Sequence, residues 1–298
     1  MGLGGRLDTT NVIEKSILST ITPVSLDHTE FLGQNIDSIA FEKAGIIKDN
    51  GRVLIGPQTP RVTEIIKKIA NERNNNSFIY GRDWFFNSNS DNSIKLNFKE
   101  NSLFLPKPRL NGFHQISNAA QAAACTMAQD IFKITESNLE IGILNAYWPG
   151  RLQKINVNLP EKKITNLQVW LDGGHNASAG TYLSKSIKSL GIEKTSKIVL
   201  ILGMLDNKDF VSYLEQFKKI IDLMIFIPVP NSNNYHSPDK LKNFSEMNLR
   251  VKAKTAKDFF DALNIIDTMV PLKNTKIITC GSLYLVGEVL KINGYNFK

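Results

Sequence analysis

The sequence predicts an α/β fold in two domains, and three observations carry this prediction. At 298 residues with 42% hydrophobic content, the chain is long enough for one large domain or two ordinary ones, and we expect two. Short apolar runs alternate with helical patterns along most of the chain, as in parallel sheets covered by helices. The turn sequence Trp148–Arg151 separates a first half that contains a hairpin-like excursion from a second half of strictly alternating strands and helices.

Composition excludes several classes of protein. The only cysteines, Cys125 and Cys280, lie in apolar runs far apart, so we expect no disulfide framework and a reducing compartment. Neither a basic-then-apolar leader nor a run of roughly 18 apolar residues is present, so we predict a soluble, cytoplasmic protein without a membrane span. The net charge of +8 is scattered over single and paired lysines without a reader motif, which argues against nucleic acid and suits small anionic ligands.

The chain begins with a glycine-rich loop at Gly2–Gly5, which taken alone is more often just a turn. A short helix is predicted over 11–16 and a buried strand over 19–26. The next helix is predicted over 35–48, with Gly51 ending it.

Lys43 lies in the apolar stripe of that helix, whose other members are Ile36, Ile39, Ala40, Ala44 and Ile47. An unpaired buried ammonium is heavily penalised, so this lysine must snorkel, find a partner or lose its charge by modification. Snorkelling is the usual outcome for a lone lysine. Asp27 and His28, however, follow the apolar run of the preceding strand, at the end where open α/β sheets bind ligands. We therefore predict that His28 and Lys43 face one pocket.

The rest of the first half contains both kinds of pattern. A short strand is predicted over 53–55, and a helix starts at Thr59–Pro60. Short alternating runs then indicate an antiparallel excursion, over 78–80, 84–86, 94–98 and 103–105. The alanine-rich segment 118–132 predicts a helix, and a second helix is expected through about Tyr147.

In the second half, the strands are nearly continuous runs of Val, Ile and Leu. They are predicted over 167–171, 198–202, 223–227, 249–253 and 276–280. Helices are predicted between them, near 177–190, 208–220, 238–245, 257–270 and 282–292. Such strands are typical of a sheet that is buried on both faces. We therefore predict a doubly wound, parallel, Rossmann-like domain.

Two strand ends in this half carry concentrated polar chemistry. The first reads Asp172-Gly-Gly-His175-Asn176, where glycines let the backbone approach a ligand. The second is Cys280-Gly-Ser282, which offers a hydroxyl and backbone N–H groups to an anion at a helix N-terminus. Both are also ordinary strand-to-helix turns, and Ser282 is equally well explained as a helix N-cap. His175 favours a function, because a cap does not need an imidazole.

Together these motifs resemble the folylpolyglutamate synthase and dihydrofolate synthase family of ATP-dependent, Mur-type amide ligases. The resemblance spans the whole chain and rests on eight motifs in one order: Gly2–Asn11, Asp27–Gly33, Glu42–Lys48, Asn111–Ala120, Pro149–Arg151, Asp172–Asn176, Leu202–Asp209 and Cys280–Tyr284. It implies that residues 1–149 are part of the ATP-binding, Mur-ligase-type central domain. Residues 150–298 are then the Rossmann-like C-terminal ligase domain.

The resemblance also implies substrates and residue roles. In this family, glutamate is joined to a folate or to dihydropteroate through an acyl phosphate made from ATP, with Mg²⁺ present. His28 matches a magnesium ligand, and Lys43 matches a lysine that is carbamylated, which would remove the misplaced charge. The remaining matches are Leu7, Asp8 and Thr9 in the pterin-side loop, Asn118, Arg151 and Asp172 at ATP, and His175 and Ser282 near the incoming glutamate.

The sequence departs from the family in the phosphate-binding parts. Met1 stands where a strand and a magnesium-binding glutamate precede the glycine loop, and no Gly-Lys dipeptide of a phosphate loop occurs in the chain. We therefore expect an N-terminally truncated ligase that needs a separately encoded fragment with the phosphate loop. Two alternatives remain: a non-catalytic remnant of a split gene, and a Rossmann-like nucleotide-binding module for another ligand.

Overall fold

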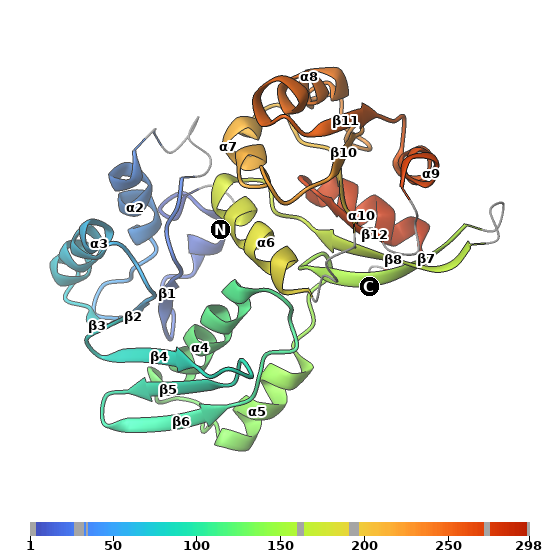
Figure 1. Ribbon diagram of the computed structural model, residues 1–298. Coiled ribbons are helices and arrows are strands. Elements are labelled where there is room, and N and C mark those ends of the chain that lie inside the picture. Colours follow the sequence, from blue (N-terminus) through green and yellow to red (C-terminus); the bar gives the residue numbers. More distant parts are fainter. Residues whose placement is uncertain are drawn as a thin grey trace. The chain divides into compact units, whose positions relative to one another are not determined.

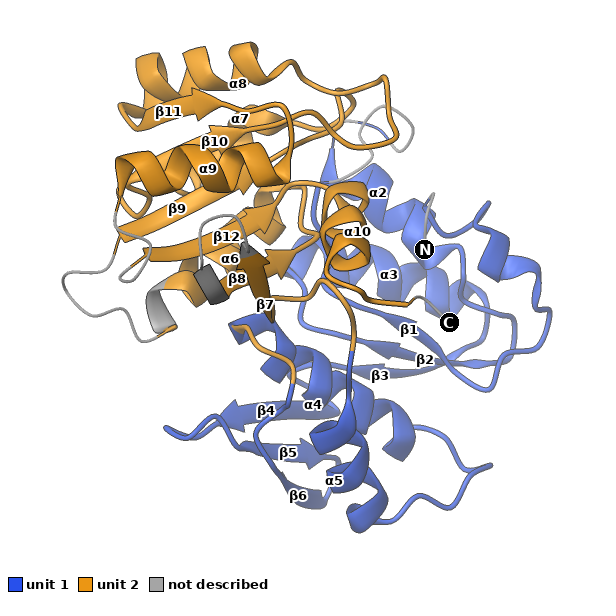
Figure 2. Cartoon of the chain, turned by 90° about the vertical axis from the view of Figure 1, so that its right-hand side faces the viewer, with its two compact units in different colours: residues 1–109, 113–147 blue, residues 110–112, 148–298 orange. Residues whose placement is uncertain are grey.

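The computed structural model describes residues 4–26, 33, 35–159, 164–190, 197–270 and 275–296. The chain forms two compact units, coloured separately in Figure 2: unit 1 spans 1–109 and 113–147, and unit 2 spans 110–112 and 148–298. The change of unit after Tyr147 lies beside the turn at which we placed the domain boundary. The α/β fold with mostly parallel sheets is confirmed, whereas the assignment of a central and a ligase domain stays a prediction.

Unit 1 contains a three-stranded parallel sheet in the order β1-β2-β3 (Figure 1). Its strands and the two helices that follow β1 and β2 are β1 (Ser19–Ile21), α2 (Ile36–Ala44), β2 (Arg52–Ile55), α3 (Pro60–Glu72) and β3 (Asn76–Ile79). Val53 and Ile55 pack with α2 and α3, whereas Leu54 between them packs with α4 (Phe113–Met127). The alternation of side chains along β2 therefore buries both faces of this small sheet.

Side-chain caps set the start of both helices on the first face. Asn35 accepts a hydrogen bond from Ser38 N at 2.8 Å to begin α2, and Thr59 precedes Pro60 at the first position of α3. The predicted apolar stripe of α2 is confirmed, because Ile39 and Ala44 are fully buried. The predicted length is wrong, since the helix ends at Ala44, where the backbone turns through Gly45.

A second sheet in unit 1 is antiparallel, with β4 (Trp84–Ser88), β5 (Ile94–Phe98) and β6 (Asn101–Leu105) in sequence order. It packs on α4 and α5 (Glu136–Asn145) around the fully buried Trp84. The predicted excursion is thus confirmed for three of its four runs. The fourth, around Phe78, belongs to β3, which pairs in parallel with β2. A short apolar run does not reveal whether its partner is parallel or antiparallel.

Unit 2 is built on a six-stranded sheet with the order β11-β10-β9-β12-β8-β7. The strands are β7 (Gln153–Leu159), β8 (Ile164–Asp172), β9 (Lys197–Leu202), β10 (Leu223–Phe226), β11 (Lys252–Thr255) and β12 (Thr275–Cys280). Every neighbouring pair is parallel except β7 with β8. The parallel core confirms the prediction, and β7 at the edge was missed.

Helices cover both faces of this sheet (Figure 1). The helices are α6 (Ala177–Ser189), α7 (Phe210–Glu215), α8 (Pro238–Phe244), α9 (Phe259–Met269) and α10 (Leu283–Ile292). Alternate residues of β9 divide between two apolar clusters: Val199 packs with α9 and α10, and Leu200 packs with α6, α7 and α8. The domain is therefore doubly wound, as the continuous apolar strands predicted.

Some predicted bounds are wrong at the start of the chain and near β11. The strand expected over 19–26 is only three residues long, and the helix expected over 11–16 is a 3₁₀ turn, η1 (Thr9–Val12). The strand expected over 249–253 begins at Lys252, after a π-helical turn, η3 (Ser245–Leu249), and the left-handed Arg250.

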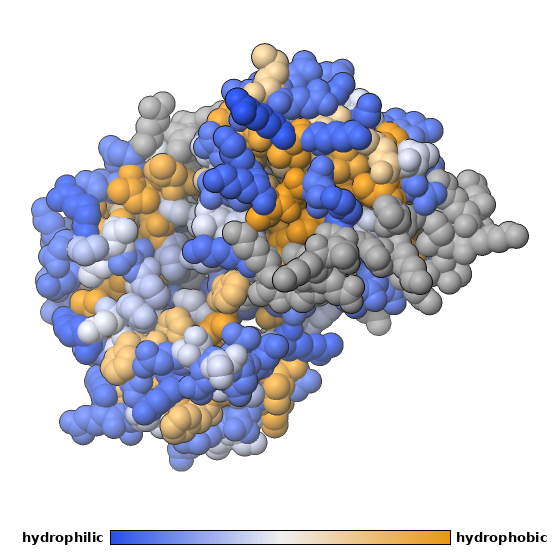
Figure 3. All heavy atoms as spheres, in the orientation of Figure 1, coloured by the Kyte–Doolittle hydropathy of each residue, from blue (hydrophilic) through white to orange (hydrophobic). Residues whose placement is uncertain are grey.

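Among the residues that the structure describes, no helix is long and apolar enough to cross a membrane. Both cysteines are free, with Cys125 half-buried and Cys280 fully buried. Hydrophobic side chains reach the surface of unit 1 between hydrophilic ones, as the lower left of Figure 3 shows. Three of the most exposed lie near the start of the chain, namely Leu7, Val12 and Ile13.

Candidate functional site

In unit 2, the candidate site lies at the carboxyl ends of the neighbouring strands β8 and β12. Asp172 and Cys280 are the last residues of these strands and are paired in register. The turn after β8 carries His175, and Ser282 follows β12. Ligands of open α/β sheets bind at this edge, and the structure brings together the two motifs that the sequence singled out.

Asp172 fixes the backbone on both sides of the site. Its Oδ2 accepts a hydrogen bond from Leu152 N at 3.0 Å, and its Oδ1 accepts one from Gly174 N at 2.8 Å. Burial raises the pKa of Asp172 above its usual value, while these two bonds and the charge of Arg151 act in the opposite direction. Asp172 is only 6% exposed. In this structure its carboxylate joins two loops by hydrogen bonds and has little contact with solvent.

The loop before β7 has an uncommon backbone conformation, and the hydrogen bond from Leu152 N to Asp172 helps to hold it. Gly150 and Leu152 both have positive φ angles, of 69° and 41°. For a leucine this region is sterically costly, and it persists where the surroundings enforce it. The Leu152 N–H bonds to Asp172, and Gly150 O accepts a hydrogen bond from Gly173 N at 2.9 Å. Arg151 therefore stands exposed between two fixed residues, beside the buried carboxylate.

Glycines allow the strand ends to approach one another closely. A Cβ on Gly281, whose φ is +95°, would lie 2.8 Å from Gly203 O, and one on Gly173 would lie 2.3 Å from Leu283 Cδ2. Gly281 N also donates to Gly174 O at 3.2 Å. A side chain at Gly281 would push the two segments apart, so this glycine is required for the geometry of the site, whereas the flexible side chain of Leu283 can move away from a Cβ on Gly173.

His175 and Ser282 have different local roles. His175 is half-buried, and its Nδ1 lies 3.0 Å from Gly173 O. Ser282 is 3% exposed and caps α10, since its Oγ accepts a hydrogen bond from Tyr284 N at 3.1 Å. Ser282 is therefore the N-cap of α10, as one of the two explanations predicted, and a role in binding glutamate stays a prediction.

In unit 1, the glycine-rich loop packs on the end of α2. Arg6 N donates to Glu42 O at 3.0 Å, and the Arg6 and Glu42 side chains form an ion pair at 3.2 Å. A Cβ on Gly5 would lie 2.5 Å from Glu42 O, and one on Gly45 would meet Arg6 backbone atoms at 2.8–2.9 Å. Both glycines are therefore needed for the backbones of the loop and of α2 to come into contact. This packing explains the glycines of the loop without a ligand.

The predicted pterin-side residues lie at this loop. Asp8 is 5% exposed and caps η1, with its Oδ1 accepting hydrogen bonds from Thr10 N at 2.9 Å and Thr10 Oγ1 at 2.6 Å. Thr9 is exposed, and Leu7 has 70% of its surface open to solvent. The predicted contact of these residues with the pterin stays a prediction.

Lys43 lies in the last turn of α2 and is half-buried. Asp27 and His28 fall outside the described residues, so their predicted meeting with Lys43 stays a prediction. Asn118, on α4, is exposed and donates a hydrogen bond to Gln115 Oε1 at 3.1 Å. Its predicted contact with ATP is likewise untested.

One contact near Lys43 was missed by sequence reasoning. Lys48 Nζ donates to Asn11 O at 3.0 Å and to Asn11 Oδ1 at 2.7 Å, and Asn11 Nδ2 donates to Arg6 O at 3.0 Å. These bonds fasten η1 and the glycine loop to the segment after α2. Both residues belong to motifs that the sequence analysis recognised, but no spacing rule pairs positions so far apart in the chain.

No group of three or more His, Cys, Asp or Glu side chains in the described part of the chain is arranged to hold a metal ion. An unmodified Lys43 adds no ligand, because an ammonium has no lone pair to donate. The described residues by themselves therefore do not fit a complete magnesium site.

Comparison with known proteins identifies the family. A family model described as the C-terminal domain of dihydrofolate synthetase matches residues 153–292. The dihydrofolate synthase/folylpolyglutamate synthase of Haemophilus influenzae is 30% identical over 297 residues, which cover 97% of this chain and 66% of that protein. The chain belongs to the folylpolyglutamate synthase and dihydrofolate synthase family. It spans about two thirds of the length of this relative.

Solved structures of the family share the fold. Escherichia coli FolC in complex with DHPP and ADP matches with a TM-score of 0.83 and 26% identity, over 98% of this chain and 65% of that one. A bifunctional folylpolyglutamate synthase/dihydrofolate synthase with Mn, AMPPNP and L-glutamate bound matches with a TM-score of 0.80 and 25% identity, over 99% and 66%. The two units therefore adopt the architecture of this family.

Proposed function

We propose that this chain takes part in the ATP-dependent ligation of L-glutamate to a folate or to dihydropteroate. The observation that carries the proposal is the convergence of Asp172, His175 and Ser282 at one edge of a doubly wound sheet in a member of this family. Relatives with bound ADP, or with Mn, AMPPNP and L-glutamate, support ATP, a divalent cation and glutamate as its ligands.

The proposed reaction has two steps. The terminal carboxylate of the folate or dihydropteroate attacks the γ-phosphorus of ATP, which forms an acyl phosphate and releases ADP. The amine of glutamate then attacks the acyl carbon, phosphate leaves, and the amine loses a proton as the amide forms. Such chemistry depends on charge stabilisation and on the positioning of two substrates more than on a side-chain nucleophile.

We assign the residues of unit 2 to the nucleotide and glutamate. The exposed Arg151, held between Gly150 and Leu152, is suited to bind an anionic group of ATP, and Asp172 maintains that loop. His175, half-buried with its Nδ1 directed to Gly173 O, presents the rest of its imidazole near the glutamate. Ser282 and the start of α10 offer N–H groups to a carboxylate.

We assign unit 1 to the pterin side and to the metal. Leu7, Asp8 and Thr9 form the pterin-side loop, and Asn118 on α4 contacts ATP. Carbamylation of Lys43 would turn a half-buried ammonium into a carboxylate that, with His28, supplies oxygen and nitrogen ligands to Mg²⁺. The cation, when bound, neutralises phosphate charge.

The phosphate-binding loop must come from outside these 298 residues, because no Gly-Lys dipeptide occurs among them. We propose that it is supplied by a polypeptide segment that pairs with β1. Among the described strands β1 pairs only with β2, and the nearby Val12 is 79% exposed and Ile13 58%. Two free cysteines suit a reducing compartment such as the cytoplasm.

The test is an assay of glutamate-dependent ADP release with tetrahydrofolate or dihydropteroate. The full chain is measured alone and together with a polypeptide that carries a phosphate loop of this family. We expect turnover only in the mixture. Turnover by the chain alone would contradict the need for a second segment, and inactivity in both arms would favour the competing hypothesis of a non-catalytic remnant.

Lys43→Arg separates modification of this lysine from simple snorkelling. Arginine keeps the charge and length but cannot carry the carbamate, so we expect turnover in the mixture to fall by about 10- to 100-fold while the protein stays folded. Lys67→Ala, on the neighbouring helix α3, is the matched control. ¹³C NMR of the full chain in ¹³C-bicarbonate reports a carbamate carbon without any activity assay, and the absence of that signal, or its persistence in Lys43→Arg, would refute the role of Lys43.

A further inference from the structure

A cavity of about 320 Å³ opens in unit 1, apart from the residues assigned above. It lies at the amino ends of β2 and β3, because Arg52 and Asn76 are the first residues of these strands and are paired in register. The far wall comes from the turn between β5 and β6 and from the segment that follows α4. This is the edge of the sheet opposite to the one where α/β folds usually bind substrates.

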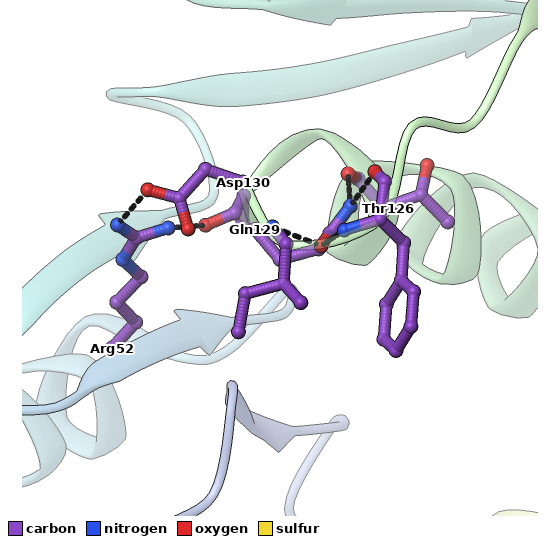
Figure 4. Close-up of polar contacts among 7 residues, drawn as sticks. Arg52, Thr126, Gln129 and Asp130 are labelled. Atoms are coloured by element: carbon purple, nitrogen blue, oxygen red, sulfur yellow. Dashed lines mark hydrogen bonds and ion pairs between the residues drawn. The ribbon is translucent and has the colours of Figure 1, made fainter.

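The floor of this cavity, which we call the Arg52 cavity, is apolar. Phe78 and Phe98 are 6% and 4% exposed, and their ring centroids lie 5.3 Å apart. Met127 and Ala128 line the same space. Gln129 holds this segment in place, since its Nε2 donates to Thr126 O at 3.0 Å and its Oε1 accepts from Phe132 N at 2.7 Å (Figure 4). The floor is therefore a fixed apolar surface of two rings tilted by 36° to each other, against which an aromatic ring can pack.

The rim of the Arg52 cavity is cationic. Lys99 Nζ lies 5.0 Å from the centroid of the Phe78 ring and makes no ion pair with the described residues. Its backbone has a φ of 51°, in the left-handed region that favours glycine or asparagine. Lys99 is the first residue of the two-residue turn between β5 and β6, where hairpins commonly have this backbone, so the turn holds Lys99 at the rim of the cavity.

Arg52 supplies the second cation of the rim, and its guanidinium forms an ion pair with Asp130. Arg52 Nη2 and Asp130 Oδ2 lie 2.5 Å apart, and Figure 4 shows the two side chains pointing toward each other. The Asp130 side chain is 70% exposed, whereas that of Arg52 is 32% exposed. An exposed carboxylate can turn into solvent at little cost, because surface ion pairs are weak. Asp130 thus occupies a position on Arg52 that an incoming anion can take.

We propose that the Arg52 cavity binds a small aromatic carboxylate. The ring lies on the floor made by Phe78 and Phe98, and the carboxylate lies between Lys99 and Arg52 in place of Asp130. A volume of about 320 Å³ is at the lower end of the range for ligand pockets, so the occupant is a small molecule.

The test uses benzoate and the full chain, with ¹³C-methyl-labelled methionine. Met127 lines the cavity, whereas Met204 and Met224 are buried in the core of unit 2. Titration is expected to shift the Met127 methyl signal with a Kd on the order of a millimolar, as is usual for so small a probe, and to leave the other two unchanged. Met127→Leu assigns the signal. Acetate lacks the ring and benzylammonium reverses the charge, so both are expected to bind at least about 10-fold more weakly.

Three variants test the cationic rim. Arg52→Gln and Lys99→Gly are each expected to weaken benzoate binding about 10-fold, and glycine at position 99 relieves the left-handed backbone, so unfolding does not explain the loss. Asp130→Asn is expected to tighten binding several-fold, because it removes the competing charge. The last result separates this proposal from a purely structural Arg52–Asp130 pair, for which Asp130→Asn would bring no gain in binding.

Matched controls lie elsewhere in unit 1. Arg61 pairs with Asp37 at 2.7 Å on the surface, and Lys95 lies 5.6 Å from the Phe104 ring centroid, yet neither lines the cavity. Arg61→Gln and Lys95→Ala are therefore expected to bind benzoate as the unchanged chain does. Equal binding by Arg52→Gln, equal binding of benzylammonium, or weaker binding by Asp130→Asn would each overturn the proposal. None of these measurements depends on ligase activity.

Discussion

In both units the candidate site contains a glycine in close contact with another backbone segment and a buried aspartate. The two sites differ in their position in the sheet. In unit 2, Gly281 touches Gly203, and Asp172 joins two loops at the ends of inner strands of a six-stranded sheet. In unit 1, Gly5 touches Glu42, and Asp8 caps a short turn before β1, an edge strand among the described residues. We infer that the site in unit 2 is rigid, because the strands that carry it have neighbours on both sides. The site in unit 1 lies beside a strand that has a neighbour on one side only among the described residues.

The largest expected effect is on Gly281. A Cβ there would meet Gly203 O at 2.8 Å and force alanine into a φ of +95°. We expect Gly281→Ala to lower the free energy of unfolding by about 2–4 kcal/mol, from backbone strain and overpacking together. Gly5→Ala has the closer contact, at 2.5 Å, but its loop can shift at the open edge, so we expect about 1–2 kcal/mol. Urea unfolding monitored by circular dichroism measures both.

Gly142→Ala in α5 is the control, because a Cβ there meets nothing within 4 Å. An alanine in an open helical position is expected to stabilise the chain by about 0.5–1 kcal/mol. Equal losses for Gly281→Ala and Gly5→Ala would break the contrast between a rigid and an open site.

The open edge itself is tested by replacing exposed apolar residues. Val12→Lys together with Ile13→Lys places two charges on the exposed apolar segment that precedes β1, and charged side chains oppose association through such a segment. We expect the unmodified chain to self-associate at high concentration and the double variant to do so less, as measured by sedimentation velocity. Lys substitution of the exposed Met247 in unit 2 is the control and is expected to change nothing.

Asp172 makes the stability of the chain depend on pH. Its pKa is raised in the folded state by burial, so the folded chain holds this proton more tightly than the unfolded chain does. The resulting stability is fully present below the unfolded pKa, near 3.9, and is lost as pH rises through the raised folded pKa. The stability of the unmodified chain relative to Asp172→Asn is therefore expected to increase as pH falls from 7 toward the unfolded pKa near 3.9.

Urea unfolding of the two proteins at several pH values measures this difference. A relative stability that is constant over this whole range, or that falls with acid, would show that the hydrogen bonds from Leu152 and Gly174 outweigh burial. Asp8→Asn in unit 1 provides the parallel measurement at the open edge.

The smallest effect concerns the two thiols. Burial raises the pKa of both, and more strongly for the fully buried Cys280 than for the half-buried Cys125. Because the thiolate is the reactive form, we expect iodoacetamide to label Cys125 slowly and Cys280 only after unfolding. Mass spectrometry after timed labelling checks the order, and faster labelling of Cys280 would show that unit 2 opens more readily than unit 1.

Local patterns in the sequence determined much of this fold. The apolar runs located the parallel strands of unit 2, and Thr59–Pro60 and Asn35 marked helix starts, because periodicity and capping act within a few residues. The motif at Asp172–Asn176 was predicted to form a site because it directly follows an apolar strand, and its role in binding stays a prediction. The alternation of Ile155, Val157 and Leu159 was a signal for β7 that went unused.

Only the tertiary structure decided which distant segments meet. It placed the run around Phe78 in the parallel sheet, joined Lys48 to Asn11, and made Asp172 a brace for the strained Leu152. It also assembled the Arg52 cavity from four separate segments. Backbone contacts and buried hydrogen bonds between residues far apart in the chain leave no periodic trace in the sequence, because each partner satisfies a requirement that arises only after folding.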